Sequence, residues 1–152
     1  ANRGRASECS SLSSYRKMKP VLVVSLQRHK ADCAVAALAT ILRVPYEEVL
    51  VTAAMVEPLV LVEGLDNDDM IEIAKRFGRT LTERTGDEID YRTAVGILGA
   101  HLKTHENPND EHAVVLSQGL VFDPDSKGEI WRVRDWIRHF KATAIDLLEL
   151  ED

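Results

Sequence analysis

The strongest constraint on the fold is the run CAVAALATIL at residues 33–42, whose side chains are almost all small or apolar. A helix that is apolar on all sides has to lie inside the protein. Asp32 is a favourable N-cap residue before the run. Pro45 follows shortly after it, and a residue that precedes proline avoids the helical conformation. We therefore expect a central, buried helix from about Cys33 to Leu42.

Two further helices should follow the first. Pro45 is suited to the first turn of a helix that includes YEEVLVTAAM, residues 46–55. Asp66 or Asn67 can cap a third helix with an apolar face, and Gly78 is a suitable residue just beyond its end. The first half of the chain is thus predicted to be mainly helical.

The second half has the patterns of strands and turns. Ser117-Gln118-Gly119 separates two short apolar runs and predicts a hairpin. Residues 91–102 are ambiguous, because Gly96 and Gly99 disfavour a helix and residues 95–98 are compatible with a strand. The predicted strands are Val21–Ser25, Thr80–Arg84, Ala113–Leu116 and Leu120–Phe122, with a late helix at Trp131–Lys141 and a last strand or tail at Thr143–Leu150. Helices followed by an antiparallel sheet indicate the α+β class.

The length of 152 residues and the hydrophobic content of 45% indicate one domain with an adequate core. Residues 1–19 are rich in serine and arginine and poor in large apolar residues. We expect them to form a disordered N-terminal arm. Residues 20–152 should form the single folded domain.

Charge and hydropathy exclude several classes of function. The net charge is −6 and no stripe of basic residues occurs, so a nucleic acid partner is not expected. No stretch approaches the roughly 18 apolar residues of a membrane span, and no signal peptide is visible. A cytoplasmic location is the default expectation. Cys9 and Cys33 should remain thiols. No cofactor is expected, and the oligomeric state is left undefined.

Cys33 is the first candidate for chemistry, because it opens the buried helix. The positive end of a helix dipole favours a thiolate over a thiol. A nucleophilic thiolate also needs a basic partner that protonates the leaving group. His112 is the best candidate, since it begins the apolar strand HAVVL at the end of a polar loop.

A third group must orient the histidine. Asp123 follows the strand that pairs with the His112 strand, so the hairpin can place the two side chains together. Asp125 is its nearest rival for this role. Gln27 lies six residues before Cys33, and its amide could bind a developing oxyanion together with the Cys33 backbone N–H.

These residues belong to segments that resemble the bacteriocin-processing, papain-like cysteine peptidases of the C39 type. QRHKADCAVAALATILRVPYEEV resembles the nucleophile segment of that family, with a glutamine, five residues and a cysteine that opens a helix. GLDNDDMIEIAKRFGRTL is similar to its second amphipathic helix, and HAVVLSQGLVFDPD to its histidine strand, hairpin and Asp-Pro. The family usually has glycine where this chain has Ala34.

The resemblance, over roughly residues 20–126, implies a papain-like fold in a free-standing domain. It also implies cysteine peptidase activity on a peptide or protein substrate, often after paired small residues in a leader. In this interpretation Cys33, His112 and Asp123 form the triad and Gln27 supports the oxyanion.

Other interpretations stay open from the sequence. Cys33 could be an ordinary core cysteine, His112 a structural histidine and Asp123 the start of an Asp-Pro turn. The same domain could bind peptides without turnover, or use its triad for deamidation or transamidation. A zinc site could combine Cys33 with His29, His101 or His105. For Trp136, core packing against the sheet is the expected role.

Overall fold

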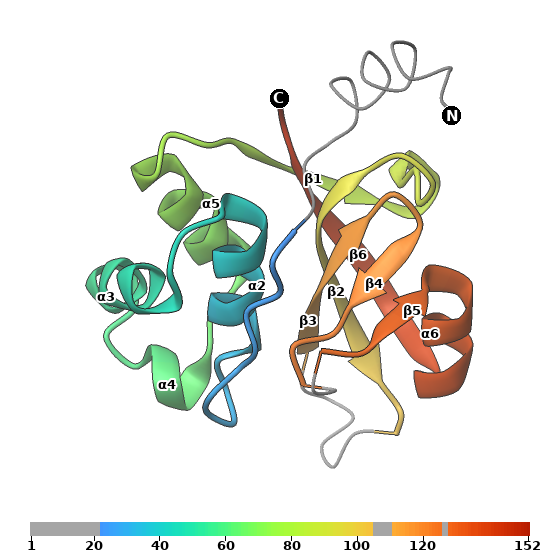
Figure 1. Ribbon diagram of the computed structural model, residues 1–152, viewed down its shortest axis with the longest axis horizontal. Coiled ribbons are helices and arrows are strands. Elements are labelled where there is room, and N and C mark those ends of the chain that lie inside the picture. Colours follow the sequence, from blue (N-terminus) through green and yellow to red (C-terminus); the bar gives the residue numbers. More distant parts are fainter. Residues whose placement is uncertain (1–21, 105–110, 126–127) are drawn as a thin grey trace, which may run out of the picture.

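The computed structural model describes residues 22–104, 111–125 and 128–152 of the chain. The N-terminal arm predicted at residues 1–19 lies outside the described residues. In the described part, a group of helices packs against one side of a curled antiparallel sheet (Figure 1). The predicted α+β class is therefore confirmed.

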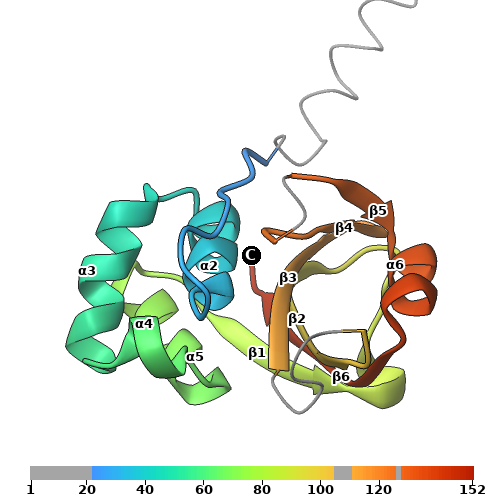
Figure 2. The same ribbon diagram turned by 90° about the horizontal axis from the view of Figure 1, so that it is seen from below.

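The helical layer is built around the predicted central helix. Helix α2 spans Cys33–Leu42, as expected, and every residue after Cys33 in it is buried. Three more helices surround it (Figure 2). They are α3 (Tyr46–Val56), the short α4 (Val60–Glu63) and α5 (Asn67–Arg76). Helix α5 also contacts strand β1 (Leu81–Thr85) of the sheet.

Two of the predicted helix boundaries have the expected chemistry. The Asp66 side chain accepts a hydrogen bond from the backbone N–H of Asp69, and the Asp69 side chain accepts one from the Asp66 N–H. This reciprocal capping box starts α5. Gly78, with a φ of 76°, follows its C-cap residue in the left-handed region that favours glycine.

The sheet has six strands in the order β1-β6-β2-β3-β4-β5, and all of its pairs are antiparallel. The predicted hairpin joins β3 to β4 through Gln118 and Gly119, both with positive φ. Seen from below, the sheet curls, with α2 next to β3 and α6 on the opposite side (Figure 2). The strands are β1 (Leu81–Thr85), β2 (Val95–Leu102), β3 (Glu111–Ser117), β4 (Leu120–Phe122), β5 (Ile130–Arg132) and β6 (Ala142–Leu150), with a 3-10 turn at Gly86–Glu88.

Each face of the sheet has its own hydrophobic core, because neighbouring side chains of a strand point to opposite faces. Ala113 and Val115 of β3 pack in the core shared with α2, α3 and α5. Val114 and Leu116 pack on the other face, with Trp136 of helix α6 (Val133–Phe140). Strand β3 therefore lies between the two cores, and its first residues meet the N-terminal end of α2.

The ambiguity at residues 91–102 resolves to strand β2. Its glycines allow close approach of strand β6, since a Cβ on Gly96 would lie 2.2 Å from the carbonyl oxygen of Leu148. A Cβ on Gly99 would lie 2.6 Å from Oδ1 of Asp146. Both glycines thus serve packing between strands.

One predicted strand and the start of one predicted helix were wrong. Residues 22–25 of the predicted strand Val21–Ser25 form no strand. They run beside α2 instead, where the Ser25 N–H donates to Oγ1 of Thr40 at 2.9 Å. The late helix begins at Val133 rather than Trp131, because residues 130–132 extend the sheet as β5 by pairing with β4.

Candidate active site

Cys33 is the first residue of α2, partly exposed and not in a disulfide. The first N–H groups of a helix have no partner within the helix, so the Cys33 N–H lies among donors that point out of its N-terminus. The thiol therefore sits at a positive helix end. Cys9 lies outside the described residues.

Asp32 occupies the N-cap position, but the prediction that its side chain caps the helix was wrong. The carboxylate turns back toward the preceding loop and is fully buried. Oδ2 accepts a hydrogen bond from the Arg28 N–H at 2.9 Å, and Oδ1 accepts one from the His29 N–H at 3.0 Å. It therefore shapes the turn that leads from Gln27 to Cys33.

Tyr46 of α3 completes this arrangement, since its hydroxyl donates to Oδ2 of Asp32. Burial and then the hydrogen bond to Asp32 raise the pKa of Tyr46 above its usual value of 10. The Arg28 guanidinium lies over the Tyr46 ring, 4.2 Å from its centroid, and forms an ion pair with Glu47 at 2.7 Å. Asp32 and Tyr46 thus link the loop before Cys33 to α3.

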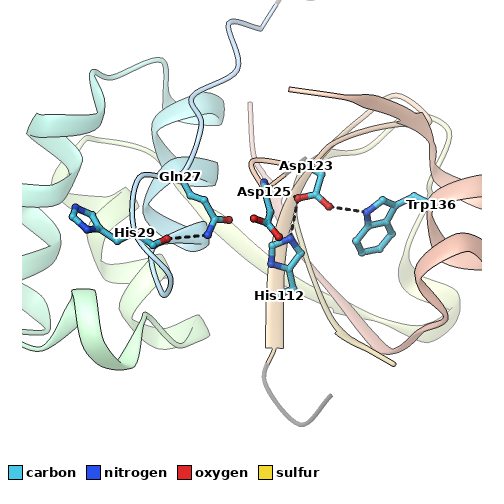
Figure 3. Close-up of polar contacts among 6 residues, drawn as sticks. All are labelled: Gln27, His29, His112, Asp123, Asp125 and Trp136. Atoms are coloured by element: carbon cyan, nitrogen blue, oxygen red, sulfur yellow. Dashed lines mark hydrogen bonds and ion pairs between the residues drawn. The ribbon is translucent and has the colours of Figure 1, made fainter. Parts of the chain in front are cut away.

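His112 and Asp123 lie together, as the hairpin predicts. Nε2 of His112 donates to Oδ1 of Asp123 at 2.9 Å (Figure 3). Both residues are buried, with exposed fractions of 4% and 2%. Because Nε2 faces Asp123, Nδ1 is the ring nitrogen left for the sulfur of Cys33.

Cys33 and Asp123 both determine the charge of His112. Burial lowers the pKa of His112. The hydrogen bond with Asp123, and then the hydrogen bond and charge of Cys33, outweigh this effect and raise the pKa from an ordinary 6.5 to about 10. The raised pKa favours the protonated form of the imidazole. A buried histidine that contacts both a carboxylate and a cysteine has the partners that a nucleophilic cysteine–histidine pair requires.

Asp123 receives hydrogen bonds at both of its carboxylate oxygens. Besides His112, the Asp125 N–H donates to Oδ1 at 2.9 Å, and Nε1 of Trp136 donates to Oδ2 at 3.1 Å (Figure 3). Burial raises the pKa of Asp123, but the bond and charge of His112, and then the bonds from Asp125 and Trp136, bring it below the ordinary value. Asp123 therefore stays ionised beside His112.

Asp125, the rival for the orienting role, contacts Asp123 through its backbone. Its side chain is exposed, whereas the hydrogen bond with the His112 ring is made by Asp123. The geometry assigns Asp123, rather than Asp125, to the histidine.

Gln27 lies on the other side of the junction between helices and sheet. Its N–H donates to the Pro124 carbonyl at 3.4 Å, which ties the loop before Cys33 to the residue after Asp123. Its Nε2 donates to the His29 carbonyl at 2.9 Å, and its Oε1 is buried without a hydrogen-bond partner in the described structure (Figure 3). The fold thus brings Gln27 near the site, while its side-chain NH₂ group is hydrogen-bonded within its own loop.

The two described histidines of the alternative zinc site, His29 and His101, do not lie in helices. His29 precedes α2, His101 lies in strand β2, and His105 is outside the described residues. Among the residues that the structure describes, no group of three or more potential ligands could hold a metal ion.

Two cavities in the described part of the chain lie away from the candidate site residues. One of about 290 Å³ lies at the far end of α2 and is lined by residues such as Ile41, Arg43 and Val95. Another of about 310 Å³ lies beside α3 and α4. None of the four candidate residues lines either, so the polar network is what locates the site.

None of the helices described in residues 22–152 is long and apolar enough to cross a membrane.

No protein-family profile matches the chain. No curated protein matches it either. Among solved structures, the chain is similar to a double glycine motif protease from an AMS/PCAT transporter, determined in complex with the leader peptide. The TM-score is 0.62 and the sequence identity 20%, over 87% of this chain and 93% of that chain. The fold is that of a double glycine motif protease. The predicted papain-like fold of the bacteriocin-processing type is thereby confirmed.

The sequence interpretation missed Trp136 and Tyr46 as parts of this network. The sequence predicts Tyr46 only as a residue of the second helix and Trp136 only as a core residue. A polar tip on a large buried side chain is the available signal, since a buried indole N–H or phenol usually finds a partner. The partner itself is distant in sequence and could not be identified without the fold.

Proposed function

We propose that this protein is a cysteine hydrolase that acts on a peptide or amide substrate. The observation that carries the proposal is the position of His112, buried and hydrogen-bonded to Asp123, with Cys33 close enough to raise its pKa. The fold supports a peptide as the substrate, because the similar protease was solved with a leader peptide bound.

The proposed reaction is acyl transfer in two steps. The Cys33 thiolate attacks the substrate carbonyl carbon and forms a C–S bond, while negative charge moves to the carbonyl oxygen. As the tetrahedral intermediate collapses, the His112 imidazolium gives its proton to the leaving nitrogen and the C–N bond breaks. His112 then takes a proton from water, the hydroxide attacks the thioester, and the C–S bond breaks to release the acid and the thiolate.

Asp123 orients the ring and stabilises its positive charge in both steps. The Cys33 N–H at the start of α2 is the backbone donor proposed for the oxyanion. Gln27 is the second proposed donor. Because Nε2 now donates to His29, we propose that its amide reorients when substrate binds.

The engaged amide of Gln27 also favours a second candidate, a peptide-binding module without turnover. Such a module would keep the fold and lack one oxyanion donor. Deamidation or transamidation would use the same triad on a glutamine side chain and leave the peptide chain uncut.

A cleavage assay distinguishes these functions. The protein is incubated with a peptide library containing paired small residues, and products are identified by mass spectrometry, with Cys33→Ala as the control. Cleavage that is lost in Cys33→Ala supports the peptidase. Ammonia release without cleavage would move the proposal to deamidation. Binding without either product would leave the binding module.

A further inference from the structure

Helix α6 contributes a side chain to the candidate site that the triad interpretation does not include. Trp136 is fully buried, and its Nε1–H donates to Oδ2 of Asp123 at 3.1 Å. Asp123 is also almost fully buried, so this bond lies where water does not compete for the carboxylate. The indole thus donates to the carboxylate oxygen that does not face His112.

The three donors divide between the two oxygens of Asp123. Oδ1 receives His112 and the Asp125 N–H, while Oδ2 receives Trp136. A carboxylate held at one oxygen can rotate about its Cβ–Cγ bond, whereas donors at both oxygens set its plane. The indole therefore helps to set the plane in which Oδ1 meets His112.

The core on the α6 face of the sheet fixes the indole itself. Trp136 packs with Leu98, Val114 and Leu116 and contacts the Phe140 ring, with centroids 6.0 Å apart. A fully buried bicyclic side chain in such a core has one available position. The orientation of Asp123 is thus coupled to the packing of α6.

The neighbouring tryptophan provides the contrast. Trp131 also packs against this core, yet its Nε1 is buried and has no hydrogen-bond partner in the described structure. Burial of an indole in this core therefore does not by itself provide a partner. The bond from Trp136 to Asp123 is specific to the position of α6.

We propose that Trp136 is a positioning residue, which holds the Asp123 carboxylate in the plane required to orient His112 toward Cys33. The inference rests on the proposed function, because it concerns the reactivity of the same cysteine. It predicts that loss of the indole N–H weakens the thiolate–imidazolium pair even when the core is filled.

The test measures the rate of Cys33 alkylation by iodoacetamide across pH, in protein with Cys9→Ser. Trp136 is replaced by 3-benzothienylalanine, in which sulfur takes the place of the N–H and the shape is kept, and by Phe. Trp131→Phe is the matched control, since it removes an indole whose N–H has no hydrogen-bond partner among the described residues. Each variant is also made in an Asp123→Ala background.

The expected result is an alkylation rate at mildly acidic pH that falls about tenfold in both Trp136 variants, the ratio for one charge-assisted hydrogen bond. The acid limb of the profile should move to higher pH. Trp131→Phe should change the rate by less than about twofold. In the Asp123→Ala background the Trp136 effect should vanish, since the two residues act through one bond.

Three outcomes overturn the inference, and they are distinguishable. If the wild-type rate depends on His112 but the benzothienylalanine variant matches wild type, Trp136 does not position Asp123 and the proposed function stands. An effect of equal size with and without Asp123 also refutes positioning, since it would be structural. If the wild-type rate does not change in His112→Ala, the proposed function fails, and the inference fails with it.

Discussion

Removal of the Tyr46 hydroxyl should destabilise the loop that carries Gln27. In Tyr46→Phe the buried Asp32 carboxylate keeps the Arg28 and His29 N–H donors and loses its third. A hydrogen bond to a charged group contributes about 1.5–3 kcal/mol. The ring stays in place, so its packing and the stacking of Arg28 over it should be retained.

The expected change in melting temperature follows from this free energy. For a chain of this size, 1 kcal/mol corresponds to about 2–4 °C, so Tyr46→Phe should melt about 3–12 °C lower. Thermal unfolding followed by circular dichroism measures the change. Tyr91→Phe is the control, because Tyr91 is partly buried and no hydrogen bond is described for its hydroxyl. Equal melting temperatures for wild type and Tyr46→Phe would refute the view that this bond braces the loop.

Three further perturbations test other parts of the structure. Because the pKa of His112 is raised from 6.5 to about 10, its pairing stabilises the fold fully below about pH 6.5 and loses this effect as the pH rises to about 10. The difference in unfolding free energy between wild type and His112→Ala should shrink over that range, and a constant difference would contradict it. The lowered pKa of Asp123 implies a stabilisation that is present above its usual pKa of about 3.8 and lost on further acidification. In acid unfolding, the stability of Asp123→Asn should therefore depend less on pH than that of wild type. Gly96→Ala would bring a Cβ to 2.2 Å from the Leu148 carbonyl, so denaturant unfolding should show a loss of about 1–3 kcal/mol, and wild-type stability would exclude the close approach.

The elements that could be predicted from sequence are those with strong local signals. The apolar run at residues 33–42 requires burial, and the structure has α2 at those residues. The hairpin between β3 and β4 follows from Gln118-Gly119 between two apolar runs. That hairpin also accounts for the approach of Asp123 to His112, because the register of two short strands leaves little freedom.

The features that could not be predicted depend on partners distant in sequence. Asp32 has the residue type of a helix cap, but the Arg28 and His29 N–H groups and the Tyr46 hydroxyl compete for its carboxylate. Gly96 disfavours a helix in the sequence, but its close approach to the Leu148 carbonyl depends on the pairing of β2 with β6. The predicted helix starts two residues later than expected, at Val133, because Ile130–Arg132 pair with the edge of β4 as a strand.

The roles proposed for Cys33, His112, Asp123 and Gln27 stay predictions until the cysteine is tested. The most direct measurement is the pH dependence of Cys33 alkylation by iodoacetamide in the Cys9→Ser protein, compared with His112→Ala. The account predicts rapid alkylation well below about pH 8.5, where a free cysteine is largely protonated, and its loss in His112→Ala. A rate that follows a free thiol in both proteins would contradict the thiolate–imidazolium pair on which the proposed hydrolase depends.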